Sequence, residues 1–237
     1  MAQRILIIVT SNARMGEHAK PTGLWAEELA VPYYALLDAG AEVEIASPRG
    51  GQVPLDPGSL KPAGQNDPAV ERLLADPVAM DRLAHSRVVA ELDASRFDAV
   101  FFPGGHGTMW DLPLDAGVTR AVEAAFAADK VIAAVCHGPA GLVTARRPDG
   151  QSILAGRRVN GFTDAEEAAA GLDQVVPFKL ESRMRELGGR FESGPLWQPY
   201  AVTDGRLVTG QNPASSRLVA EHTLALLGLA AAPATAG

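Results

Sequence analysis

One cysteine and the histidine beside it are the residues of this sequence best suited to nucleophilic chemistry. Cys136 is the only cysteine, His137 follows it at once, and the apolar run 131–135 leads directly into the pair. Pro139 favours a helix start just beyond. A side chain at such a strand-to-helix turn projects above the carboxyl end of a sheet, near unpaired helix N–H groups that favour a thiolate. A lone cysteine often only fills a core, but this placement predicts a nucleophile with His137 as its proton partner.

A second segment that could take part in catalysis follows another apolar strand. Gly104 and Gly105 stand directly before His106. Paired glycines let a backbone N–H approach a reacting atom, and together with the N–H of His137 they predict an oxyanion hole. Gly-Gly turns are common, and we expect His106 to be structural.

Two pairs of adjacent glutamates are candidates for proton transfer or for orienting the imidazole. Glu27 and Glu28 fall early in an expected helix, where carboxylates also serve the plain role of stabilising the helix N-terminus. Glu166 and Glu167 fall in a later segment, and one of them is a candidate third member of a triad with His137. Spacing alone does not select within either pair.

Apolar strands alternate with helical segments in the order that builds an α/β fold with a doubly wound, mostly parallel sheet flanked by helices. The expected strands are 5–9, 43–46, 99–102 and 131–135, and the expected helices are about 25–39, 69–83, 118–128, one from Pro139, and about 214–227. Asp204-Gly205 between two β-rich segments predicts a C-terminal hairpin.

The length of the chain favours a single domain over residues 1–229. Residues 48–95 interrupt the alternation with Gly, Pro and Asp turns, which is typical of an inserted surface or lid segment. We expect the small residues of 230–237 to form a flexible tail.

Composition excludes several classes of protein. The net charge of -7 provides no basic patch for nucleic acid. The first apolar run is too short to span a membrane, so we expect neither a membrane partner nor a secretory leader. A single cysteine permits no internal disulfide and suits the cytoplasm. The five histidines show no short ligand spacing, so no metal site is expected.

Ordered motifs along most of the chain resemble the DJ-1/PfpI superfamily, in particular its Hsp31-like branch of glutathione-independent glyoxalases, protein deglycases and holding chaperones. The motifs are Thr22-Gly with Glu28 and Pro32, Ala46-Ser-Pro-Arg-Gly-Gly, Pro103-Gly-Gly-His-Gly-Thr, Val135-Cys-His-Gly-Pro, Gly161-Phe-Thr-Asp, and Thr203-Asp-Gly-Arg-Leu-Val-Thr-Gly-Gln-Asn-Pro-Ala-Ser. The resemblance implies a flavodoxin-like fold of the class I glutamine amidotransferase type and a cytoplasmic homodimer.

The resemblance also implies site residues. The nucleophile falls on Cys136, the triad histidine on His137 and the triad acid on Glu167, with Glu166 as the neighbouring alternative. A protonated glutamate that touches the thiol falls on Glu28.

The remaining implied roles concern substrate binding. Gly105 and His137 would supply the oxyanion N–H groups, and Trp110 would be a pocket wall. The implied activity is that of a cysteine-dependent lyase of the glyoxalase III type, which converts methylglyoxal to lactate through a hemithioacetal without glutathione or another cofactor. Its partner would be a small reactive aldehyde.

Three other functions are possible for a chain with these residues, and each predicts a different feature. Class I glutamine amidotransferases take a histidine and a glutamate from a late His-x-Glu motif, which the segment around His222 lacks. A stress chaperone would bind unfolded client proteins, with Cys136 dispensable or serving as an oxidation sensor. A protease is disfavoured by the expected lid over the pocket.

Overall fold

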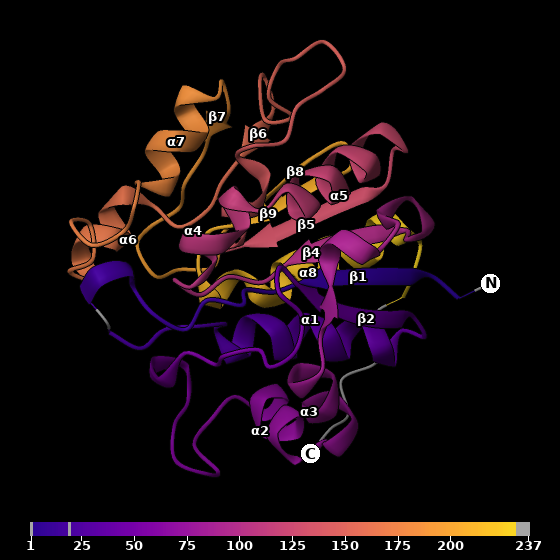
Figure 1. Cartoon of the computed structure of the whole chain (residues 1–237), viewed down its shortest axis with the longest axis vertical. Helices are drawn as coiled ribbons and strands as arrows, with labels where there is room; N and C mark the ends of the chain where they lie inside the picture. Colours follow the sequence, from indigo (N-terminus) through magenta and orange to yellow (C-terminus); the bar gives the residue numbers. More distant parts are fainter. Residues whose placement is uncertain (1, 19, 231–237) are drawn as a thin grey trace.

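The computed structural model describes residues 2–18 and 20–230, and its centre is a seven-stranded sheet (Figure 1). The strands are β1 (Arg4–Ile8), β2 (Glu42–Ser47), β3 (Arg87–Val88), β4 (Ala99–Phe102), β5 (Val131–Val135), β8 (Ala201–Asp204) and β9 (Leu207–Gly210). Their order in the sheet is β3-β2-β1-β4-β5-β9-β8, and every neighbouring pair is parallel except β8 with β9. The predicted mostly parallel α/β sheet and the C-terminal hairpin are confirmed.

Helices cover both faces of the sheet. Helices α1 (Ala26–Asp38) and α8 (Ser216–Leu227) pack together, while α5 (Ala116–Ala127) lies across the sheet from them (Figure 1). The shorter α-helices are α2 (Pro68–Ala75), α3 (Pro77–Ala84), α4 (Thr108–Asp111), α6 (Asp164–Ala169) and α7 (Leu180–Glu186). A separate parallel pair, β6 (Arg158–Val159) and β7 (Arg190–Phe191), lies beside α7. Within the described residues, no helix has the length and hydropathy needed to cross a membrane.

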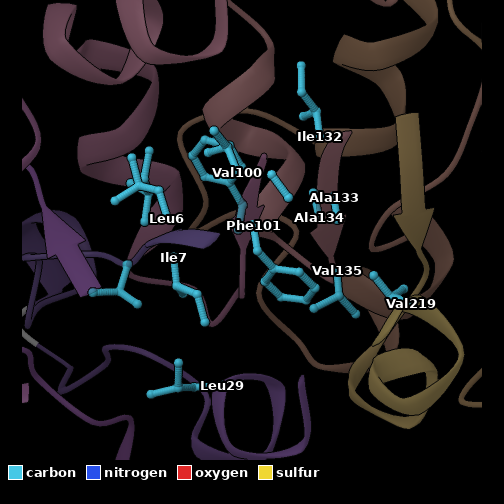
Figure 2. Close-up of a cluster of buried hydrophobic side chains, with 14 of the residues drawn as sticks. Leu6, Ile7, Leu29, Val100, Phe101, Ile132, Ala133, Ala134, Val135 and Val219 are labelled. Carbon is cyan, nitrogen blue, oxygen red and sulfur yellow. The ribbon is translucent and has the colours of Figure 1, made fainter. Parts of the chain in front are cut away.

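The central strands are apolar along their whole length because helices bury them from both sides. Strands β4 and β5 are buried at every position. Figure 2 shows Leu29 of α1 and Val219 of α8 below the strands, where Ile7, Phe101 and Val135 also lie. These continuous apolar runs, which the sequence contains at 99–102 and 131–135, hold the carboxyl ends of the two strands rigidly.

The order of the strands opens a crevice beside β1. After β1 the chain adds β2 and β3 on one side, then crosses to β4 and β5 on the other. Connections that leave neighbouring strands in opposite directions leave a gap at their carboxyl ends, where ligands bind in folds of this class. The segments that follow β1, β4 and β5 meet at this gap.

The expected helix 69–83 is two helices. Pro77 has no N–H with which to continue α2, and Asp76 instead caps α3 by accepting hydrogen bonds from the backbone N–H groups of Val78 and Ala79. The inserted segment 48–95 also contributes β3 to the edge of the main sheet. It is therefore partly integral to the fold, which sequence alternation alone did not indicate.

Two other predicted segments are the helix from Pro139 and the C-terminal tail. The helix expected from Pro139 is a short 3-10 helix, Gly138–Leu142, and not an α-helix. Of the expected tail 230–237, residues 231–237 lie outside the described part of the chain.

Candidate active site

Cys136 occupies a sharp turn at the end of β5. Its φ of 59° lies in the left-handed region, which is strained for any residue with a side chain. Two backbone bonds hold it there: its N–H donates to the carbonyl of Gly210 and its carbonyl accepts from Phe162. A Cβ on Gly138 would lie 2.1 Å from the Phe102 carbonyl oxygen, so the turn also requires glycine at that position. The strand-to-helix turn predicted for Cys136 has the geometry of a nucleophile elbow.

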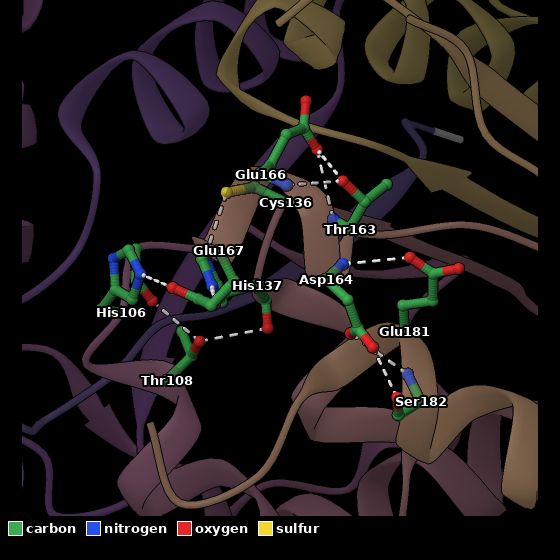
Figure 3. A network of polar contacts seen from close by, with 11 residues as sticks. His106, Thr108, Cys136, His137, Thr163, Asp164, Glu166, Glu167, Glu181 and Ser182 are labelled. Atoms are coloured by element: carbon green, nitrogen blue, oxygen red, sulfur yellow. Dashed lines mark hydrogen bonds and ion pairs between the residues drawn. The ribbon is translucent and has the colours of Figure 1, made fainter. Parts of the chain in front are cut away.

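A hydrogen-bonded chain links the thiol to an imidazole and a carboxylate (Figure 3). The Cys136 Sγ lies 3.3 Å from His137 Nδ1. On the other side of the ring, His137 Nε2 lies 2.7 Å from Glu167 Oε2. All three side chains are buried. This is the arrangement of nucleophile, base and orienting acid that nucleophilic catalysis requires.

The structure distinguishes Glu167 from its neighbour. Glu167 faces the imidazole, whereas the Glu166 side chain accepts hydrogen bonds from the Thr163 backbone and hydroxyl. Thr163 in turn caps α6, so the two residues form a capping box. Successive residues of a helix point about 100° apart, which is why only one of the two carboxylates reaches His137.

His106 joins the same network, although the sequence suggested only a structural role. Its Nε2 lies 2.7 Å from Glu167 Oε1, and its ring centroid lies 4.0 Å from that of His137. The two oxygens of Glu167 therefore bind one histidine each. His106 and Glu167 are 61 positions apart in the chain, so their contact could not be predicted from spacing. The presence of a histidine in the Gly-Gly loop was the one sequence feature that pointed to a role for His106 in the site.

His106, His137 and Glu167 are also the one group within residues 2–18 and 20–230 with the composition and proximity to hold a metal ion, since their ligand atoms lie within 4.8 Å of one another. Sequence spacing does not reveal such a group, because its members come from three segments that are far apart in the chain. Each histidine already forms a hydrogen bond of 2.7 Å with the Glu167 carboxylate, so a metal ion would have to displace the protons of these two hydrogen bonds.

Burial and the neighbouring side chains together set the protonation states of His137 and Glu167. Burial and, next to it, the nearby His106 lower the pKa of His137 to about 4, against the pull of Glu167. Burial opposes ionisation of Glu167, but His137 and His106 outweigh it and bring its pKa to about 2. Near neutral pH, His137 is therefore a neutral base and Glu167 a carboxylate.

Glu28 reaches the thiol from α1 and is fully buried. Its Oε2 accepts a 2.7 Å hydrogen bond from the Gly104 N–H, while its Oε1 has no hydrogen-bond partner among the residues that the structure describes. Burial raises the pKa of Glu28 to about 8, although Cys136 and the Gly104 N–H oppose the shift. The carboxyl therefore keeps its proton near neutral pH, as the resemblance implied.

The expected resting thiolate does not match this environment. Burial raises the pKa of the Cys136 thiol, and the charge of an ionised Glu28 would raise it further. The 3-10 helix that follows is too short to add a strong helix dipole. The structure instead favours a thiol that gives its proton to His137 when it attacks.

The backbone N–H groups of Gly105 and His137 both approach Cys136, as expected for an oxyanion hole. Gly105 has a φ of 98°, and a Cβ there would lie 2.2 Å from the Gly23 carbonyl oxygen. Thr108 supports this loop by donating its hydroxyl proton to the carbonyl of Gly105, with the His137 carbonyl 3.1 Å away.

A cavity of about 490 Å³ opens above these groups. It is lined by Met15, Lys20, Pro21, Trp25, Asp56, Pro57, Gly58, Gly105, His106, Cys136, His137, Phe162, Ala170, Leu172, Trp197 and Pro213. Trp110, the expected pocket wall, is not among them, because α4 directs it toward Gly16, whose Cβ would lie 3.0 Å from its Nε1. Trp25 and Trp197 are the tryptophans of the wall instead. Of the expected lid, only residues 56–58 reach the cavity.

The chain is similar to known proteins in both sequence and structure. The chain matches the DJ-1/PfpI family over residues 22–226. It is 30% identical over 235 residues to the glutathione-independent glyoxalase HSP31 of Saccharomyces cerevisiae, covering 94% of this chain and 97% of the yeast protein.

Solved structures agree with the fold. Glyoxalase III of Candida albicans superposes with a TM-score of 0.85 at 27% identity, over 94% of this chain and 97% of that one. The 24 kDa Rapid Encystment Protein of Francisella tularensis superposes with a TM-score of 0.91 at 36% identity, over 95% of this chain and 99% of that one.

Proposed function

Because the chain belongs to the DJ-1/PfpI family, we propose that it is a glutathione-independent glyoxalase that converts methylglyoxal-type 2-oxoaldehydes to 2-hydroxyacids, with lactate as the product from methylglyoxal. The observation that carries the proposal is the chain from the Cys136 thiol through His137 to Glu167, with the protonated Glu28 beside the sulfur. The glyoxalase names of its relatives support the choice of substrate.

The first step joins the thiol to the aldehyde. His137 takes the proton of Cys136 through Nδ1 as the sulfur forms a bond to the aldehyde carbon. The developing oxyanion is stabilised by the backbone N–H groups of Gly105 and His137 and then receives the proton from His137. The product is a hemithioacetal.

The second step moves the oxidation level within the bound substrate. His137 removes the proton from the carbon bonded to sulfur, while Glu28 donates its proton to the neighbouring carbonyl oxygen, which gives an enediol. His137 then returns a proton to the second carbon, and the hydroxyl beside the sulfur returns its proton to Glu28. This leaves a 2-hydroxyacyl thioester, and both side chains recover their starting states.

The third step releases the acid. His137 takes a proton from water, the hydroxide attacks the thioester carbon, and the Cys136–carbon bond breaks. The proton returns to the sulfur. The sum is one 2-oxoaldehyde plus one water giving one 2-hydroxyacid, so no external oxidant, reductant or glutathione takes part.

Lactate formation from methylglyoxal without glutathione tests the proposal. Wild-type protein is expected to form lactate, and Cys136→Ser to lose at least about a thousandfold in kcat/KM, because an alcohol is a far weaker nucleophile. Turnover by Cys136→Ser at the wild-type rate would exclude the mechanism. Suppression of client-protein aggregation by the same variant, without lactate formation in the wild type, would favour the chaperone instead.

The same nucleophile suits adducts of 2-oxoaldehydes with protein side chains, so deglycation is a second reaction within this proposal. It is measured separately, as the release of lactate from a methylglyoxal-treated peptide. The adduct must be intact and free of unbound methylglyoxal at the start. Otherwise the glyoxalase reaction would convert the free methylglyoxal to lactate, and this lactate would be mistaken for a product of deglycation.

A further inference from the structure

The cavity is larger than methylglyoxal needs. Its volume is about 490 Å³. Methylglyoxal displaces roughly three water molecules at about 30 Å³ each, which leaves most of the space unfilled. A small substrate in a large pocket buries little surface and is poorly positioned, since orientation depends on contacts at both ends of a ligand.

The unfilled part of the cavity is aromatic and apolar. Phe162 packs against His137 with ring centroids 4.3 Å apart, and Trp197 lies 5.7 Å beyond Phe162 in an edge arrangement. Trp25 and Leu172 also belong to the wall. An aromatic path therefore leads from the reacting end of the site outward.

Charged side chains in the lining do not form a site for a charged substituent. Asp56 already accepts hydrogen bonds from the Thr22 hydroxyl and the Gly58 N–H. Lys20 is exposed. The chemistry of the outer cavity thus suits an uncharged apolar group.

Trp197 has a strained backbone conformation that hydrogen bonds hold in place, which indicates that the position of its side chain is important for the site. Its φ of 62° is strained for a bulky residue. Its backbone N–H donates to the buried carboxylate of Glu166, 2.9 Å away. The same oxygen accepts hydrogen bonds from the side chains of Gln211 and Asn212. The residue as a whole remains 46% exposed and so retains apolar surface that a ligand could cover.

Resting on the proposed glyoxalase activity, we infer that the preferred substrates are 2-oxoaldehydes whose substituent is an aryl or bulky alkyl group that lies against Phe162 and Trp197. The aldehyde carbon still meets the Cys136 thiol, and the chemical steps are unchanged. With a phenyl substituent, phenylglyoxal and water give mandelate. Glu166 acts here as a positioning residue for Trp197.

The test compares kcat/KM for phenylglyoxal and methylglyoxal in the wild type, in Trp197→Ala and in Leu196→Ala. We expect the wild type to prefer phenylglyoxal by about tenfold or more, because a stacked ring adds contacts that a methyl group lacks. Trp197→Ala is expected to lower this preference about tenfold, and Trp197→Phe to retain most of it. Leu196→Ala is the matched control, since Leu196 is 45% exposed beside Trp197 but does not line the cavity.

A second measurement avoids the reactive aldehydes. Mandelate is expected to inhibit the wild type at lower concentration than lactate does, and Trp197→Ala to reduce that difference. Equal kcat/KM for the two aldehydes, or an unchanged preference in Trp197→Ala, would overturn the inference while leaving the proposed function intact. Failure of the wild type to turn over either aldehyde would refute the proposed function itself.

Discussion

Replacement of Glu28 by Gln tests the electrostatics of the site through the stability of the whole protein. Gln resembles the protonated carboxyl: its carbonyl can accept the Gly104 N–H, and its amide takes the place of the O–H. Burial raises the pKa of Glu28 from its ordinary 4.5 to about 8. Between these two values the folded protein keeps a proton that the unfolded chain releases.

The sign and size of the effect follow from proton linkage. Because the folded state binds more protons, the free energy of unfolding of the wild type falls as pH rises from 4.5 to about 8. The loss is about 1.4 kcal/mol per pH unit, about 3 kcal/mol by pH 7 and about 5 kcal/mol over the whole interval. Glu28→Gln carries no titrating group there and escapes this loss. The stability of the variant relative to the wild type is therefore expected to increase with pH by these amounts.

Urea unfolding of both proteins at several pH values measures the difference in their free energies of unfolding. The pH values span the interval between the two pKa values of Glu28, 4.5 and about 8, over which the difference should grow by roughly 1.4 kcal/mol per unit. Glu17→Gln removes a charge from an exposed position and is the charge-matched control. A stability difference between Glu28→Gln and wild type that does not change with pH would refute the reasoning, because Glu28 would then ionise alike in the folded and unfolded states.

The same variant is expected to lose activity as it gains stability. Gln cannot exchange a proton, so kcat should fall by about 10²- to 10⁴-fold. In the wild type, kcat/KM should fall above about pH 8 as Glu28 loses its proton. Full activity of Glu28→Gln would remove Glu28 from the proton transfer steps.

Glu167→Gln should lower kcat by about 10²- to 10⁴-fold with little change in KM, since the neutral amide no longer orients the imidazole; an unchanged kcat would contradict this. His106→Asn should move the acid limb of the kcat/KM profile to higher pH, because burial and then His106 lower the pKa of His137. A limb that stays in place would show that His106 does not influence His137. Gly105→Ala should destabilise the fold by about 2–4 kcal/mol in urea unfolding, since its Cβ would meet the Gly23 carbonyl oxygen. Wild-type stability would contradict that contact.

Local sequence was sufficient to predict the scaffold and the turn that carries Cys136. The runs at 99–102 and 131–135 are apolar at every position, and this pattern is typical of strands buried on both faces, which is where they lie. The turn at Cys136 could be predicted because strand, small residues and Pro139 are contiguous. The sequence pattern missed a helix boundary where a single residue ends the helix, as at Pro77, which divides the expected helix 69–83.

The sequence by itself determined the central strands along the chain, the turn that presents Cys136 and the glycines beside it, because these depend on residues adjacent in the chain. Only the tertiary structure decided that Glu167 and not Glu166 meets His137, that His106 shares its carboxylate, and that Trp197 and not Trp110 lines the cavity. These features join segments far apart in the chain, and side-chain direction within a helix depends on packing. Burial likewise decided that the Cys136 thiol rests protonated. Desolvation depends on the groups that surround the thiol in space, and these cannot be read from the residues beside it in the chain.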